Sequence, residues 1–268
     1  MVMPNYFIIL LFASILSLSL IISPTLLILS HAQNNTTDLS GNSSDISANG
    51  KGGISAQDVY QNRTMAFGDS IKNIIILLPN EGHESPALPK DQRIINQPYV
   101  PENIVVSPGT NIVWLNGDVG HTHTITLVDE NGGQAYSSGK FDFNTVTNPL
   151  VLNKTRKFTY SEADVNQDDP KYVMQGTITV SENPSPNGTN GTSDTVAFFM
   201  VPAKDLDKHV SEITKKGIDV LDKYTFKDLR GGQKGTGPEQ TLLLVGSKDG
   251  PSQLISTLQS IASTLPYS

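Results

Sequence analysis

The chain has 268 residues, a formal net charge of −7 at pH 7 and no cysteine. The negative charge excludes the large basic surface of a typical nucleic-acid-binding protein. The lack of cysteine excludes disulfide bonds, cysteine-ligated zinc, iron–sulfur clusters and any thiolate catalyst. A chain of this length usually contains one or two folded domains besides any targeting segment.

The N-terminal residues 1–32 carry no charged side chain, and residues 6–29 are almost wholly apolar. About 20 apolar residues are enough to span a bilayer, so we predict a hydrophobic N-terminal helix. Ser30-His31-Ala32 resembles a small-x-small cleavage site. Two alternatives follow, a cleaved signal peptide and a retained membrane anchor. Both predict an extracytoplasmic protein, either secreted or held at the cell surface.

Two polar stretches, residues 33–57 and 181–194, are rich in Asn, Ser, Gly and Thr. They bury too little apolar surface to fold, so we predict flexible linkers. Asn-x-Ser/Thr patterns gather in and around them and predict a glycoprotein, unless Asn and Thr are there simply as good linker residues. These patterns begin at Asn34, Asn35, Asn42, Asn62, Asn153, Asn187 and Asn190.

The first folded unit, residues 58–180, has the pattern of an all-β domain. Short apolar or alternating runs are separated by Gly, Pro and Asn, which is typical of a sandwich or a barrel. The predicted strands cover residues 71–78, 103–106, 111–115, 122–128, 151–153, 156–160 and 176–180.

The second folded unit, residues 195–268, mixes strands and helices. Leu206, Val210 and Ile213 form a helical stripe within residues 203–216, and Pro251 begins a second helix. Strands are predicted at 195–201, 218–229 and 241–245. The order β-α-β-β-α predicts a small α+β domain of the ferredoxin-like type.

Two histidines, His121 and His123, stand at the start of a predicted strand. Side chains two residues apart share one face of a strand, so both rings are predicted to point the same way and to bind one metal ion. Imidazole ligands suit copper, zinc, iron and nickel. The alternative is two surface histidines in a polar loop.

The residues around this pair resemble the cupredoxins, the blue-copper family of plastocyanin and pseudoazurin. The resemblance covers residues 99–180. His123-Thr-Ile-Thr matches the family's His-Thr-Val-Thr, whereas the spacing of His121 from Asp118 matches the pseudoazurin-like alternative, so the ligand histidine stays open. Met174-Gln-Gly-Thr-Ile-Thr-Val180 matches the family's last ligand strand. The resemblance implies a Greek-key sandwich, copper and electron transfer.

The chain departs from the family at the ligand cysteine, where Glu162 stands. A blue-copper site depends on a copper–thiolate bond, so only a non-blue histidine site is open to this chain. The candidates to complete it are a carboxylate, from Glu162 or Asp164, and the side chains of Met174 and His83. Their alternative roles are a solvated acidic loop for Glu162 and Asp164, core packing for Met174 and a loop position for His83.

These observations support one main hypothesis and two alternatives. The first is an exported, cell-surface, cupredoxin-like protein that binds copper, or zinc instead, for metal holding, delivery or modified electron transfer. The second is a metal-free structural or interaction module, with residues 195–268 contacting a surface or redox protein. The third is a metalloenzyme, which would need an open coordination position; no catalytic residue is assigned.

Overall fold

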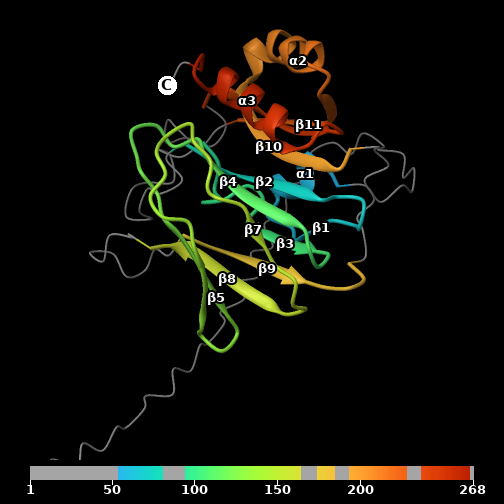
Figure 1. Cartoon of the computed structure of the whole chain (residues 1–268). Coiled ribbons are helices and arrows are strands. Elements are labelled where there is room, and N and C mark those ends of the chain that lie inside the picture. The colour runs from blue at the N-terminus through green and yellow to red at the C-terminus, as the bar shows by residue number, and fades with distance from the viewer. Residues whose placement is uncertain (1–53, 81–93, 164–173, 185–192, 228–236, 266–268) are drawn as a thin grey trace, which may run out of the picture. The chain divides into compact units, whose positions relative to one another are not determined.

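The computed structural model describes residues 54–80, 94–163, 174–184, 193–227 and 237–265 (Figure 1). All of them belong to one unit, Asn49–Ser268. The predicted N-terminal helix, both linkers for most of their length, His83 and Asp164 lie outside the described residues. Ile54 is buried and a helix begins at Ala56, so the first linker ends earlier than predicted.

The described residues form two six-stranded sheets, both with parallel and antiparallel neighbours. In spatial order, the first sheet (sheet A) consists of β1 (Met65–Ala66), β3 (Asn103–Val106), β9 (Gln175–Val180), β8 (Lys157–Glu162), β5 (Ile125–Asp129) and β6 (Gln134–Ser137). The second sheet (sheet B) consists of β11 (Asp219–Lys227), β12 (Glu239–Ser247), β10 (Thr195–Pro202), β2 (Asn73–Leu78), β4 (Asn111–Asn116) and β7 (Leu150–Val151). The prediction of a mostly-β structure with two sheets is therefore confirmed, but sheet B includes three strands, β10, β11 and β12, from beyond residues 58–180.

Two of the described helices cover the face of sheet B that points away from sheet A (Figure 1). α2 (Leu206–Lys215), which follows a 3₁₀ turn at Ala203–Asp205, and α3 (Pro251–Ala262) lie on β10, β11 and β12. A shorter helix, α1 (Ala56–Tyr60), packs against β11 and β12. None of the helices among the described residues is long and apolar enough to cross a bilayer.

The core between the sheets is rich in aromatic side chains. Trp114 and Tyr160 are fully buried with ring centroids 5.3 Å apart, and Tyr99 lies 4.8 Å from Tyr160. Gly176 on β9 faces this cluster, where a Cβ atom would overlap the Tyr160 ring and the carbonyl oxygen of Glu102. Trp114 therefore fills the core between the sheets.

The C-terminal elements follow the predicted order β-α-β-β-α but do not form a sheet of their own. β10 is buried along its whole length, with β12 on one side and β2 on the other. It runs parallel to β2, with Thr195 opposite Asn73. A side-chain ladder strengthens this register, since Asn111 Nδ2 donates to Asn73 Oδ1 (3.1 Å) and Asn73 Nδ2 donates to Thr195 Oγ1 (3.0 Å).

A separate ferredoxin-like domain is thus not confirmed. A strand as apolar as β10 needs a neighbour on both edges and cover on both faces, because its unpaired backbone groups and apolar side chains are costly to expose. The edge of β2 supplies that neighbour. The C-terminal segment, residues 193–265, extends sheet B instead of closing on itself.

Candidate functional site

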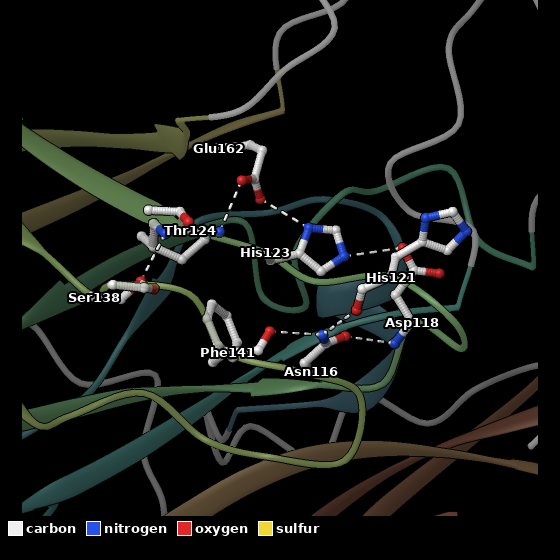
Figure 2. A network of polar contacts seen from close by, with 10 residues as sticks. Asn116, Asp118, His121, His123, Thr124, Ser138, Phe141 and Glu162 are labelled. Carbon is white, nitrogen blue, oxygen red and sulfur yellow. Dashed lines mark hydrogen bonds and ion pairs between the residues drawn. The ribbon is translucent and has the colours of Figure 1, made fainter.

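The candidate site lies where the chain leaves sheet B at Asn116 and enters sheet A at Ile125 (Figure 2). Asn116 is fully buried and organises this loop with its side chain. Its Oδ1 accepts a hydrogen bond from the backbone N–H of Asp118 (2.8 Å), and its Nδ2 donates to the carbonyl oxygens of His121 (2.9 Å) and Phe141 (3.3 Å). The amide side chain of Asn116 thereby holds the loop, and its bond to the N–H two residues on is that of an Asx-turn.

His123 is buried, with 3% of its surface exposed, and bridges to Phe141 through two backbone hydrogen bonds of 3.1 and 3.0 Å. Both ring nitrogens contact carboxylates. Nδ1 lies 2.8 Å from Glu162 Oε2, and Nε2 lies 3.0 Å from Asp118 Oδ2. Figure 2 shows the ring between the two acidic side chains. We call Asp118, His123 and Glu162 the ion triad.

Both carboxylates of the ion triad are buried, and that of Glu162 is held by a further hydrogen bond. Glu162 is the last residue of β8 and lies opposite Ile125 in the ladder with β5. Its second oxygen accepts a hydrogen bond from the backbone N–H of Thr124 (2.8 Å). Asp118 is 1% exposed. The triad therefore joins the end of β8 to the loop that connects the two sheets.

The charge of the His123 ring follows from this arrangement. Burial is the largest single influence and opposes the charged form. The hydrogen bonds and negative charges of Asp118 and Glu162 together outweigh it and raise the pKa of His123 from 6.5 to about 9. At neutral pH the ring is an imidazolium that donates both of its N–H groups.

The two histidines of the sequence pattern lie in different surroundings. β5 begins only at Ile125, so the strand that was predicted to start at residue 122 is shorter. His121 is exposed, whereas His123 is buried. The prediction that both rings share one face of a strand is wrong, because His121 lies in the loop before β5 and His123 forms only an isolated bridge to Phe141.

The other candidate residues are placed as follows. Glu162 is buried and contacts His123, so it does not lie in a solvated loop. Met174 is 2% exposed, directly before β9, and its carbonyl oxygen accepts a hydrogen bond from the backbone N–H of Glu162 (3.3 Å). Asp118 was not among the predicted ligands. The sequence feature that could have identified Asp118 as a site residue is its place in the pattern Trp114-x-Asn-x-Asp118.

The ion triad does not fit a copper ion as it stands. A histidine ligand must be neutral and must offer a free ring nitrogen, and both nitrogens of His123 are taken by carboxylates. Within the described ranges, no three His, Asp or Glu side chains are arranged to hold a metal ion. Coordination through His123 would require loss of its proton and of one carboxylate hydrogen bond.

No protein-family model and no curated protein matches the chain. Solved structures that resemble it include a purple cupredoxin from Nitrosopumilus maritimus, which is 21% identical, with 40% of this chain and 99% of that chain covered and a TM-score of 0.31. Rusticyanin from Thiobacillus ferrooxidans is 10% identical, with 47% and 92% covered and a TM-score of 0.31. Plastocyanin from Dryopteris crassirhizoma is 15% identical, with 40% and 99% covered and a TM-score of 0.27.

These three solved structures are cupredoxins, the family that the sequence motifs of the chain resemble. This chain differs from the blue-copper members in having no cysteine. At these identities and TM-scores the matches assign no ligand, partner or reaction to it.

Proposed function

We propose that this chain is a metal-free, cupredoxin-like interaction module in which the ion triad closes the position of the family's copper ligands. One observation carries the proposal: both ring nitrogens of His123 are hydrogen-bonded to carboxylates, and one of these is Glu162, the residue at the cysteine position of the family pattern. Side chains that would have to converge on a metal ion bind each other instead.

Physical chemistry supports a structural role for the ion triad. A buried charge is tolerated only when it is paired and hydrogen-bonded, and removal of one partner from a buried pair typically costs about 3–5 kcal/mol. The triad satisfies both nitrogens of the ring with a buried carboxylate on each side, and the Glu162 carboxylate is also held by the backbone N–H of Thr124. Its role in this proposal is to hold the loop between the two sheets in one conformation.

The remaining parts of this proposal rest on the sequence. We place the protein outside the cytoplasm, with residues 1–32 as its signal peptide or membrane anchor, and we expect its partner to be a surface or redox protein that contacts the C-terminal segment. Protease treatment of intact cells tests the first part, because an exported protein is degraded and an intracellular one is protected.

A second candidate function is metal holding or delivery, or modified electron transfer, with copper or zinc. It is favoured by exposed His121, which lies next to Asp118 in the same loop end as the ion triad (Figure 2). Imidazole and carboxylate donors together suit copper(II) and zinc. In this case His121 would be the first ligand, and His123 would join only after losing its proton.

Calorimetric titration of the full chain with copper(II) and with zinc(II) at pH 7 separates the two functions. The module proposal predicts no tight one-to-one binding, in the wild type as in His121→Ala. Tight one-to-one binding that is lost in both His121→Ala and His123→Ala would overturn it and establish the metal carrier. Circular dichroism of both variants ensures that any lost binding does not reflect unfolding.

A further inference from the structure

The C-terminal helix α3 is joined to the segment beside the candidate site by a reciprocal pair of hydrogen bonds. Gln259 Nε2 donates to the carbonyl oxygen of Asn144 (2.7 Å), and Asn144 Nδ2 donates to the carbonyl oxygen of Gln259 (3.0 Å). The two residues are 115 positions apart in the sequence. Each side chain thus holds the other residue's backbone.

The connection continues from Asn144 to the site in one more step. The backbone N–H of Asn144 donates to the carbonyl oxygen of Asn116 (2.7 Å). The backbone N–H of Asn116 donates to the carbonyl oxygen of Thr145 (2.9 Å). The side chain of Asn116 then holds His121 and Phe141 through their carbonyl oxygens. Phe141 is the backbone partner of His123.

Apolar side chains of the C-terminal segment also line a cavity beside the candidate site. Phe143 lines a cavity of about 20 Å³ together with Gly117, Met200 from β10, and Ala262 and Leu265 from the end of α3 and the turn after it. A cavity of this size holds about one water molecule. Apolar groups of the C-terminal segment therefore lie close to Gly117 and Phe143, in addition to the Asn144–Gln259 pair.

The conformation of Asn144 indicates that its side chain is needed there. Its φ is +60°, a region in which glycine is the ordinary choice and in which asparagine is the best tolerated alternative. Backbone geometry alone would be satisfied by glycine. The hydrogen bond to Gln259 is what an asparagine adds at this position.

We propose that the C-terminal segment is an internal brace of the candidate site, and that Asn144 is the positioning residue through which α3 holds the loop of His121 and His123. The proposal gives residues 193–265 a role within the chain and is independent of whether the site binds a metal ion or serves as a module. A partner that displaced α3 would loosen the loop at the ion triad.

Hydrogen exchange in the full chain tests the brace at the amides of His123 and Phe141, which are both hydrogen-bonded in the bridge. Three variants break the pair in different ways. Asn144→Gly keeps the left-handed backbone, Gln259→Ala removes the whole side chain, and Gln259→Glu keeps its size but cannot donate to Asn144. Ser256→Ala, on the exposed side of α3, is the matched control.

We expect each of the three variants to speed up exchange at both amides by about fivefold, the effect of one lost hydrogen bond, and the control to leave it unchanged. A double variant, Asn144→Gly with Gln259→Ala, loses both hydrogen bonds of the pair and is expected to exchange faster at both amides than either single variant.

Three outcomes would overturn the proposal. Acceleration by Gln259→Ala but not by Gln259→Glu or Asn144→Gly would make general packing the cause. Unchanged exchange at His123 and Phe141 would mean that the pair does not hold the loop. An equal acceleration in the ladder between β8 and β9 would mean that α3 affects only the stability of the whole chain.

Discussion

The carboxylate of Glu162 lies 2.8 Å from Nδ1 of His123, although the two residues are 39 positions apart. Glu162 ends β8 in sheet A, and His123 lies in the loop that comes from sheet B. The contact therefore joins the end of a strand in sheet A to the loop that connects the two sheets. It also joins the residue at the family's cysteine position to a residue at its histidine position, which makes the pair the most direct target for experiment.

Replacement of Glu162 by glutamine is expected to lower the pKa of His123 and to destabilise the fold. The amide can still accept a hydrogen bond, but the negative charge that favours the imidazolium is gone. We expect a loss of about 1–3 kcal/mol in the free energy of unfolding. Urea unfolding at pH 7 measures the loss, and histidine NMR signals report the pKa. A pKa that stays at about 9 would show that Glu162 is not the partner that matters.

The free energy of unfolding is expected to fall as the pH rises from about 6.5 to about 9. The pKa of His123 is raised in the folded chain, so the folded state binds its proton more tightly than the unfolded state does. That contribution is complete below pH 6.5 and is lost as the pH passes through about 9; it amounts to about 3 kcal/mol.

Urea unfolding at pH 6, 7.5 and 9.5 measures this dependence. His121→Ala is the matched control, since His121 is exposed and lies outside the ion triad, and it should keep the full slope. The free energy of unfolding of Glu162→Gln should depend less steeply on pH than that of the wild type. Equal stability of the wild type at all three pH values would contradict the charged triad.

Gly176→Ala is expected to destabilise the sandwich by about 2–4 kcal/mol. A methyl group at this position overlaps the Tyr160 ring and the carbonyl oxygen of Glu102, and neither the packed ring nor the backbone can move away cheaply. Thermal or urea unfolding measures the change. Val151→Ala, at a largely exposed position, should change stability by less than about 0.5 kcal/mol.

A chain that ends before residue 193 is expected not to fold as a soluble sandwich. Without β10, the edge of β2 and the apolar face of sheet B lose their cover, and an exposed apolar edge promotes aggregation. Circular dichroism and size-exclusion chromatography of the shortened chain test this. A monomeric, cooperatively unfolding product would show instead that residues 58–180 form an independent domain.

Much of the secondary structure could be predicted from the sequence because it depends on neighbouring residues. The apolar runs at 103–106 and 111–116, separated by turn residues, are strands in the structure. Pro251, predicted as the start of a helix, is the first residue of α3. Composition alone excluded a blue-copper centre, since no fold can supply a missing cysteine. Glu162 could be singled out as a carboxylate at the cysteine position of the family pattern, but it was predicted as a metal ligand and not as the ion-pair partner of His123.

Only the tertiary structure decided which distant segments pair. β10 lies beside β2 although Thr195 and Asn73 are 122 positions apart, and a β-α-β-β-α order is compatible with a separate sheet as well as with an extended one. The unlike burial of His121 and His123 depends on the bridge to Phe141, and the pairing of Asn144 with Gln259 depends on where α3 packs. The periodicity of a segment predicts which of its side chains are buried. Which residue each of them contacts depends on packing between segments far apart in the chain.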